Sequence, residues 1–233
     1  MSVLSKPEIL KHLKAGNIII SPFNPDNVAN SSYDVRLGKL FFRQDPIKHS
    51  QILNPFYEKS VRRMYDGVEE AVLVSEIKSK LNPFDGLKPK DKVILIAPNE
   101  TILAHTIEFI GGKNGTKELS AVTSEMRARS SIGRIGIAVC KCAGWGDIGY
   151  VNRWTMEITN FSNVIIPLPV GLRIAQIIFH ETVRVPDIDK YAKKGKYQTS
   201  DNIKEIIKNW KPEDMLPKLY KDKDLGHFSK FDK

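Results

Sequence analysis

A glutamate lies in the middle of a strand-like segment, where this residue is disfavoured. The segment 151–160 alternates in character, so Glu157 shares one face with Arg153 and Thr155. The opposite face carries Trp154, Met156 and Ile158. If the polar face is enclosed, burial raises the pKa of Glu157, as a general base requires. On an exposed sheet edge the same carboxylate would simply be solvated, and the segment alone leaves both interpretations open.

A second polar cluster has the sequence Arg-Ser-Ser-Ile-Gly-Arg, at residues 129–134. Guanidinium groups and hydroxyls are natural phosphate ligands, and small residues let backbone N–H groups approach an anion. The cluster therefore predicts phosphate binding. A polar loop with incidental charges would give the same pattern.

The third cluster is rich in glycine and spans residues 144–150, Gly-Trp-Gly-Asp-Ile-Gly-Tyr. Glycines allow a backbone to approach a ligand closely. Tyr150 could stack on a sugar, and Asp147 could accept a hydrogen bond from a hydroxyl. A glycine-rich β-turn without a ligand is the alternative.

Metal and dinucleotide motifs are missing from the sequence. Cys140 and Cys142 have no second cysteine pair, and the five histidines do not pair at zinc-ligand spacing. The zinc deaminase signature is absent, as are the P-loop and the dinucleotide fingerprint. We therefore expect no zinc. Because the two cysteines alternate on a predicted strand at 135–143, we expect free, buried thiols.

The composition limits the class of protein. The chain of 233 residues is 41% hydrophobic, enough for one sizeable core or at most two small ones. Its net charge of +9 favours polyanionic ligands such as nucleotides or nucleic acid, although lysines that only solvate the surface would explain it equally well. No signal peptide or long apolar run is present, so we expect a soluble cytoplasmic protein without membrane contact.

Many short strands must position these clusters. The predicted strands, separated by turn signals, are 17–20, 32–37, 92–97, 101–110, 119–123, 135–143, 150–160 and 174–182. Short helices are predicted after Ser5, with a capping box to Glu8, and at 201–210. This pattern indicates a mainly β protein, a distorted barrel or jelly-roll. We assign 1–200 to one barrel domain with an insertion at about 44–91, and 201–233 to a helical, charged extension.

Taken together in this order, the clusters resemble the dCTP deaminase family, within the dCTP deaminase and dUTPase superfamily. Residues 34–38, Asp-Val-Arg-Leu-Gly, are similar to its early strand motif, and 129–134 to its Arg-Ser-Ser-x-x-Arg signature. Asp147-x-Gly149-Tyr150, followed by Glu157 and Asn160, resembles its Asp-Pro-Gly-aromatic and Leu-Glu-x-x-Asn region. The resemblance covers roughly residues 1–40 and 92–200, and its joint spacing is the specific feature.

This resemblance implies a dUTPase-like barrel and a homotrimer with shared active sites. The implied reaction is hydrolysis of dCTP to dUTP and ammonia at cytosine C4, without zinc. Glu157 would be the base, while Ser130, Arg134 and the carbonyl of Ala143 would position water and the amino group. Magnesium would be bound through the triphosphate. The further implied substrate contacts are Arg129, Ser131, Gly133, Asp147, Tyr150, Thr155, Met156, Gln176, Tyr191, Lys196 and Gln198.

Departures from the family pattern leave other functions open. Ile148 replaces the usual proline, and Asn152 stands where a glycine is common. A dUTP diphosphatase would use Asp147 as the base for the attacking water, and a bifunctional enzyme would combine both reactions. A basic barrel that binds nucleic acid or regulates another protein is the least favoured alternative, because the whole constellation of site residues is present.

Overall fold

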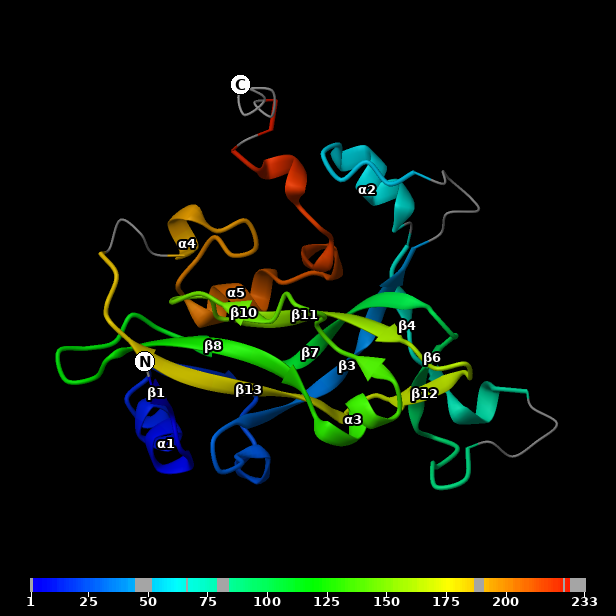
Figure 1. Cartoon of the computed structure of the whole chain (residues 1–233), viewed down its shortest axis with the longest axis horizontal. Coiled ribbons are helices and arrows are strands. Elements are labelled where there is room, and N and C mark those ends of the chain that lie inside the picture. Colours follow the sequence, from blue (N-terminus) through cyan, green and yellow to red (C-terminus); the bar gives the residue numbers. More distant parts are fainter. Residues whose placement is uncertain are drawn as a thin grey trace.

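The computed structural model describes residues 2–44, 52–65, 67–78, 84–186, 191–223 and 225–226. Parts of the expected insertion, residues 187–190 of the expected barrel domain and parts of the C-terminal extension therefore lie outside the described residues. Within the described chain, antiparallel strands curl into a half-barrel with short helices around it (Figure 1). The predicted mainly β barrel is confirmed.

The larger sheet joins ten of the described strands. Its main path runs β10 (Trp145–Gly146), β8 (Ala121–Ala128), β13 (Arg173–Thr182), β3 (Tyr33–Arg43), β7 (Thr101–Gly112), β11 (Asn152–Asn160) and β9 (Ile137–Ala138). Beside this path, β1 (Ser2–Val3) pairs with β13, β2 (Ile18–Ser21) with β7, and β4 (Glu69–Glu70) with β3. A smaller sheet has the order β12 (Ile166–Pro169), β6 (Lys92–Ile96) and β5 (Val72–Leu73).

Hydrophobic side chains fill the inside of the curled sheet. The largest fully buried residues include Tyr33, Leu37, Ile110, Met126 and Phe179. On β11 the core takes Trp154, Met156 and Ile158. Because side chains alternate along a strand, burial of these three forces Arg153, Thr155 and Glu157 to the opposite face. The packing of the core thus fixes the direction of the candidate carboxylate.

Short helices surround the sheets. They are α1 (Lys6–Lys14), α2 (Glu58–Met64), α3 (Ser130–Arg134), α4 (Tyr191–Lys194) and α5 (Ile203–Asn209), with 3-10 turns at Pro25–Asn27, Val74–Glu76, Pro212–Met215 and Leu219–Lys221. Helix α1 follows Ser5 as predicted, but the Ser5 side chain makes no capping hydrogen bond. Gly16, at φ +71°, ends this helix in the left-handed conformation that glycine tolerates.

The predicted strand at 135–143 is wrong. Only Ile137–Ala138 is extended, and the chain then turns, with Lys141 at a positive φ of 46°. This turn separates the two cysteines: Cys140 is buried against the carbonyl of Met126, whereas Cys142 is exposed. The expectation of two buried thiols therefore fails for Cys142.

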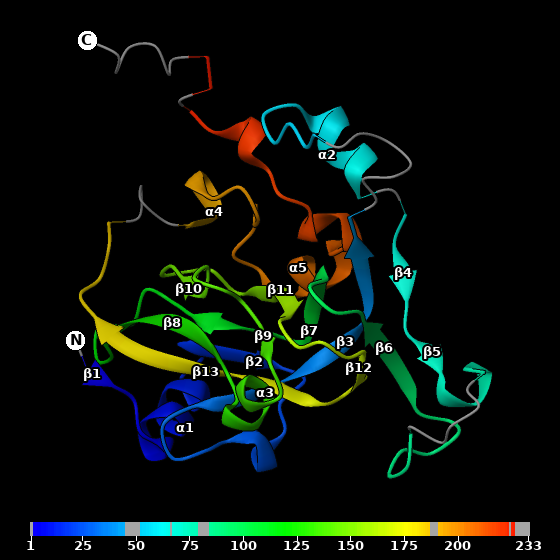
Figure 2. The same cartoon turned by 45° about the vertical axis from the view of Figure 1, so that its right-hand side comes forward.

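A second hydrophobic cluster joins the insertion to the C-terminal extension. Val61 and Met64 of α2 pack with Met215 and Leu216 against the sheet, where Phe42 of β3 and Leu103 of β7 meet them. Figures 1 and 2 show α2 and the C-terminal residues on the same side of the half-barrel. Two segments that are distant in sequence therefore form one layer over the polar face of β11.

Candidate active site

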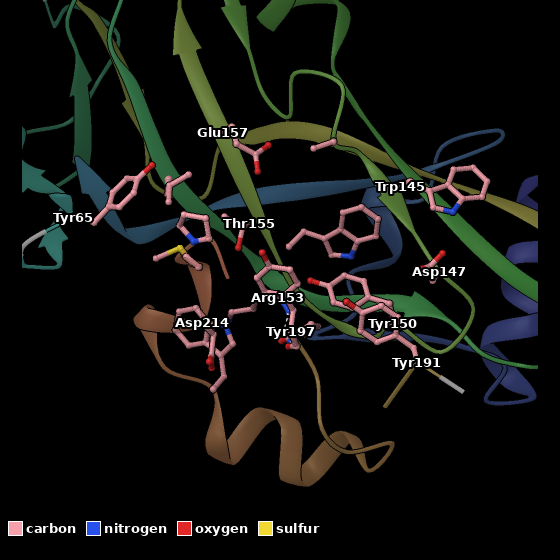
Figure 3. Close-up of a pocket in the computed structure, with 17 residues that line it drawn as sticks. Tyr65, Trp145, Asp147, Tyr150, Arg153, Thr155, Glu157, Tyr191, Tyr197 and Asp214 are labelled. Carbon is pink, nitrogen blue, oxygen red and sulfur yellow. Dashed lines mark hydrogen bonds between the residues drawn. The ribbon is translucent and has the colours of Figure 1, made fainter. Parts of the chain in front are cut away.

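A cavity of about 410 Å³ lies between the polar face of β11 and this layer. Figure 3 shows Arg153, Thr155 and Glu157 extending toward it from one strand. We call it the β11 cavity. It is lined by Tyr65, Leu103, Ala143, Trp145, Asp147, Tyr150, Asn152, Arg153, Trp154, Thr155, Glu157, Tyr191, Tyr197, Trp210, Asp214, Met215 and Pro217.

Glu157 is a half-buried carboxylate of this cavity. Its Oε2 atom is buried and has no hydrogen-bond partner among the described residues. Burial raises the pKa of Glu157, while its own backbone N–H and the charge of Lys141 act in the opposite direction. Of the two alternatives for this face, the structure shows the enclosed one. The carboxylate is therefore able both to accept a proton and to return it.

Aromatic rings form the end of the cavity near Asp147. The ring of Tyr150 lies 5.5 Å from that of Trp154 and 5.1 Å from that of Tyr191, both in edge contact. Burial raises the pKa of Tyr150, and it raises the pKa of Tyr191 to about 12, so both phenols stay neutral. Such a wall offers an apolar face beside one carboxylate, which suits a ring with hydroxyl groups.

A second cavity of about 490 Å³ adjoins the first and shares Trp145, Asp147, Tyr191 and Tyr197 with it. Lys196 lines this second cavity and forms an ion pair with Asp222 of the C-terminal extension. The cation expected to contact nucleotide is thus beyond the aromatic wall, already partnered by a carboxylate.

Gln198 holds the C-terminal segment against the start of β11. Its Oε1 accepts a hydrogen bond from the Val151 backbone at 2.8 Å, and its Nε2 donates to the carbonyls of Gly149 and Ser200 at 2.8 and 3.0 Å. The side chain is 4% exposed. In this conformation Gln198 positions the wall that carries Tyr191 and Tyr197.

The predicted phosphate ligands lie elsewhere. Arg129 pairs with Asp34 at 3.2 Å, and Arg173 approaches the same carboxylate at 3.3 Å, while burial raises the pKa of Asp34. Ser130, Ser131, Gly133 and Arg134 are exposed on α3, and Gln176 lies opposite Asp34 on β13. We call Arg129–Arg134 with Gln176 the α3 face. None of these residues lines either cavity.

One chain therefore brings together only part of the predicted site. Ala143, Asp147, Tyr150, Thr155, Glu157 and Tyr191 line the β11 cavity. Met156 is fully buried, and its side chain belongs to the core. Only its backbone remains available to a ligand.

Sequence reasoning missed the wall formed by Tyr65, Trp210 and Asp214. These residues come from the insertion, whose pattern is irregular, and from the extension, whose predicted helix at 201–210 does not indicate which element it contacts. Arg153 did have a signal, because strand alternation placed it on the face of Glu157.

The half-barrel has the mainly β fold class that the sequence predicted. Comparison with known proteins gives the family. A family model described as dCTP deaminase-like matches residues 3–182. The match spans most of the chain, so the chain belongs to the dCTP deaminase-like family and the predicted resemblance is confirmed.

Curated relatives agree with this assignment. Proteins named "dCTP deaminase, dUMP-forming" include one from Leptospira biflexa, 32% identical over 203 residues, covering 86% of this chain and 92% of the relative. Another, from Methanosphaera stadtmanae, is 30% identical over 213 residues, covering 88% and 94%. The crystal structure of 2'-deoxycytidine 5'-triphosphate deaminase from Agrobacterium tumefaciens is similar in fold, with TM-score 0.50 and 17% identity. It matches 77% of this chain, which spans about half (48%) of that one.

The described residues lack two features that would indicate other functions. No described helix is long and apolar enough to cross a membrane. No group of three or more histidine, cysteine, aspartate or glutamate side chains in the described chain is placed to hold a metal ion.

Proposed function

We propose that this chain hydrolyses the amino group of dCTP, with Glu157 as the proton shuttle. The observation that carries the proposal is the buried Oε2 atom of Glu157, unpartnered among the described residues and facing a cavity large enough for a nucleoside. The family match and the names of the relatives support the same reaction and substrate.

The proposed reaction moves both protons of one water molecule through Glu157. Ionised Glu157 takes the first proton as the water oxygen attacks C4 of the cytosine ring, and it gives this proton to N3. It then takes the proton of the new C4 hydroxyl and passes it to the amino nitrogen, so that the C4–N bond breaks, ammonia leaves and a C4 carbonyl forms. A carboxylate with a raised pKa suits these steps, because it must both take up and release each proton.

We further propose that a homotrimer completes the site. Ser130 and Arg134 of a neighbouring copy would position the water and amino group together with the Ala143 carbonyl, and the rest of that copy's α3 face would hold phosphates. The support is the separation of the α3 face from Glu157 within one chain. Asp147 and Tyr150 would hold the deoxyribose, and Lys196 would leave Asp222 for the phosphates.

Magnesium would enter with the triphosphate, as the resemblance implies. The described residues offer no cluster of metal ligands, and Asp147 is a single carboxylate, so no step is assigned to the ion. The proposed deamination likewise uses no zinc.

A second candidate outcome is release of dUMP and pyrophosphate. Two observations favour it: Asp147 lines the same cavity as Glu157, and the relatives are named dUMP-forming. Asp147 would then activate a second water for attack on the triphosphate. The dUTP expected from the sequence would be an intermediate in this case and the final product otherwise.

Incubation with dCTP, and separately with dUTP, tests the proposal. Ammonia, dUTP, dUMP and pyrophosphate are resolved over time. Ammonia from dCTP supports deamination, and dUMP from either nucleotide supports the second reaction. Absence of ammonia with an intact trimer would refute the proposed function.

A further inference from the structure

Arg153 has a different environment from every other cation near the site. It is the one lysine or arginine among the described residues that line the β11 cavity. Its guanidinium makes no side-chain hydrogen bond or ion pair in the described chain, and its Nε is buried without a partner. A half-buried guanidinium that makes no hydrogen bond is costly, so its retention on the face of Glu157 calls for a ligand.

Two aromatic rings fix the position of this guanidinium. Its central carbon lies 4.9 Å from the centre of the Phe109 ring and 4.5 Å from that of the Trp210 ring. Cation–π contacts of this kind hold a guanidinium without using its N–H groups as hydrogen-bond donors. The C-terminal extension thus takes part in the site through Trp210.

The rings are themselves held in place. Trp210 packs on His105, with ring centres 4.8 Å apart. His105 has room only because residue 38 is glycine, since a Cβ there would come within 2.1 Å of the imidazole. Burial lowers the pKa of His105 to about 4, so no second positive charge competes beside Arg153 at neutral pH.

We propose that Arg153 is a specificity-determining residue that donates to the 2-oxo group of the pyrimidine. This inference rests on the proposed function. With C4 at Glu157 and the sugar at Tyr150, the 2-oxo group is the acceptor on the side of the ring farther from Glu157, along the strand toward Arg153. Attack at C4 moves negative charge onto N3 and the 2-oxo oxygen, where a guanidinium stabilises it.

The test compares dCTP with 2-thio-dCTP, whose sulfur is a weaker acceptor. Calorimetry on Glu157→Gln protein measures binding of both without turnover. We expect about tenfold or more preference for dCTP, which Arg153→Met abolishes by lowering dCTP affinity. Arg153→Lys should recover part of the preference, and Trp210→Leu should weaken it while keeping the cation. In otherwise unaltered protein, Arg153→Met should lower kcat/KM for dCTP by about 10²-fold.

Arg62→Met is the matched control, since this exposed arginine pairs with Glu58 on α2 and does not line the cavity. It should change neither preference nor rate. If the melting temperature of Arg153→Met is equal to or above that of the unaltered protein, the loss of dCTP affinity is not caused by unfolding. If Arg153→Met does unfold, Trp210→Leu provides the second variant.

The outcomes separate this inference from the proposed function. If the preference for dCTP over 2-thio-dCTP depends on Arg153 but no ammonia is released, the inference is supported and the proposed function is refuted. Ammonia release with an unchanged preference in Arg153→Met removes the inference alone. Arg153→Met could instead weaken the binding of dCTP and 2-thio-dCTP equally and leave the binding of deoxycytidine unchanged. This result would show that Arg153 binds a phosphate, and it would overturn the inference. Failure of dCTP to bind removes both.

Discussion

The charged groups of the β11 cavity and those of the α3 face have opposite environments. In the cavity, the Oε2 of Glu157 and the Nε of Arg153 are buried without partners among the described residues. On the α3 face, Arg129 is paired with Asp34 and Arg134 is exposed to solvent. Buried, unsolvated groups act strongly on charge that develops in a ring, whereas solvated cations bind phosphates that arrive with their own charge.

This difference shows where the molecule accepts a cost in stability. An unpartnered buried charge destabilises a fold, and it persists where a ligand supplies the missing partner. The α3 face has no such cost in stability, because its cations remain hydrated or paired. In the proposed function, ring chemistry and phosphate binding would lie on separate surfaces of one chain, and the proposed trimer would join them.

Replacing Glu157 should have the largest effect on the proposed chemistry of the β11 cavity. We expect Glu157→Gln to lower the deamination rate about 10²–10⁴-fold or more, because the shape is kept while the proton shuttle is lost. Binding of dCTP should survive, since sugar and phosphate contacts come from other residues. Any dUTP diphosphatase activity should largely persist, because Asp147 is unchanged. Ammonia release and calorimetry measure these effects.

Glu118→Gln is the control, because it removes a carboxylate from an exposed turn between β7 and β8. It should leave the rate unchanged. Deamination at the unaltered rate in Glu157→Gln would point to a different base.

Mixing two inactive variants tests whether the two regions meet across subunits. We expect Arg134→Ala and Glu157→Gln each to abolish most activity. Co-expressed at equal levels as a trimer, they should recover roughly a quarter of the unaltered activity, since about one site in four pairs two intact residues from neighbouring copies. A site built within one chain would recover none. Light scattering must show the trimer, and a stable, active monomer would contradict the shared site.

Much of this comparison could be predicted from the sequence. Alternation along 151–160 placed Arg153, Thr155 and Glu157 on one face, because the core fixes strand register. The Arg-Ser-Ser-x-x-Arg cluster was recognised as a phosphate candidate from its side-chain chemistry. Its separation from Glu157 could not be derived, since residues 23 apart in sequence have no fixed spacing once turns intervene.

The cavity wall from outside the barrel was beyond sequence reasoning. Trp210 and Tyr65 reach the site through the packing of α2 and the C-terminal extension, and neither segment has a period that predicts a partner. The predicted strand at 135–143 failed for a different, local reason. Its apolar residues suggested extension, but the positive φ of Lys141 turns the chain there.

Loosening the C-terminal wall should have a smaller effect than removing the carboxylate. Gln198→Ala removes three hydrogen bonds and leaves the buried Val151 N–H without a partner, at a cost of about 1–3 kcal/mol. We expect KM for dCTP to rise up to about tenfold and limited proteolysis after residue 198 to accelerate, with the barrel still folded. Thr199→Ala, at an exposed neighbour, is the control. Unchanged KM and proteolysis would show that the wall is held by other contacts.

The smallest expected effect concerns stability and pH. Because burial raises the pKa of Glu157 above the usual value of 4.5, the folded state binds this proton more tightly than the unfolded state. Stability from this residue is therefore fully present below pH 4.5 and is lost as pH rises through the folded pKa. Glu157→Gln is neutral throughout, so its melting temperature should exceed that of the unaltered protein at pH 8, with a difference that shrinks toward pH 5. Glu118→Gln corrects for the general loss of one carboxylate. A difference that stays constant or reverses between pH 5 and 8 would show that the Glu157 carboxylate is solvated in the folded protein, which would leave the cavity no different from the α3 face.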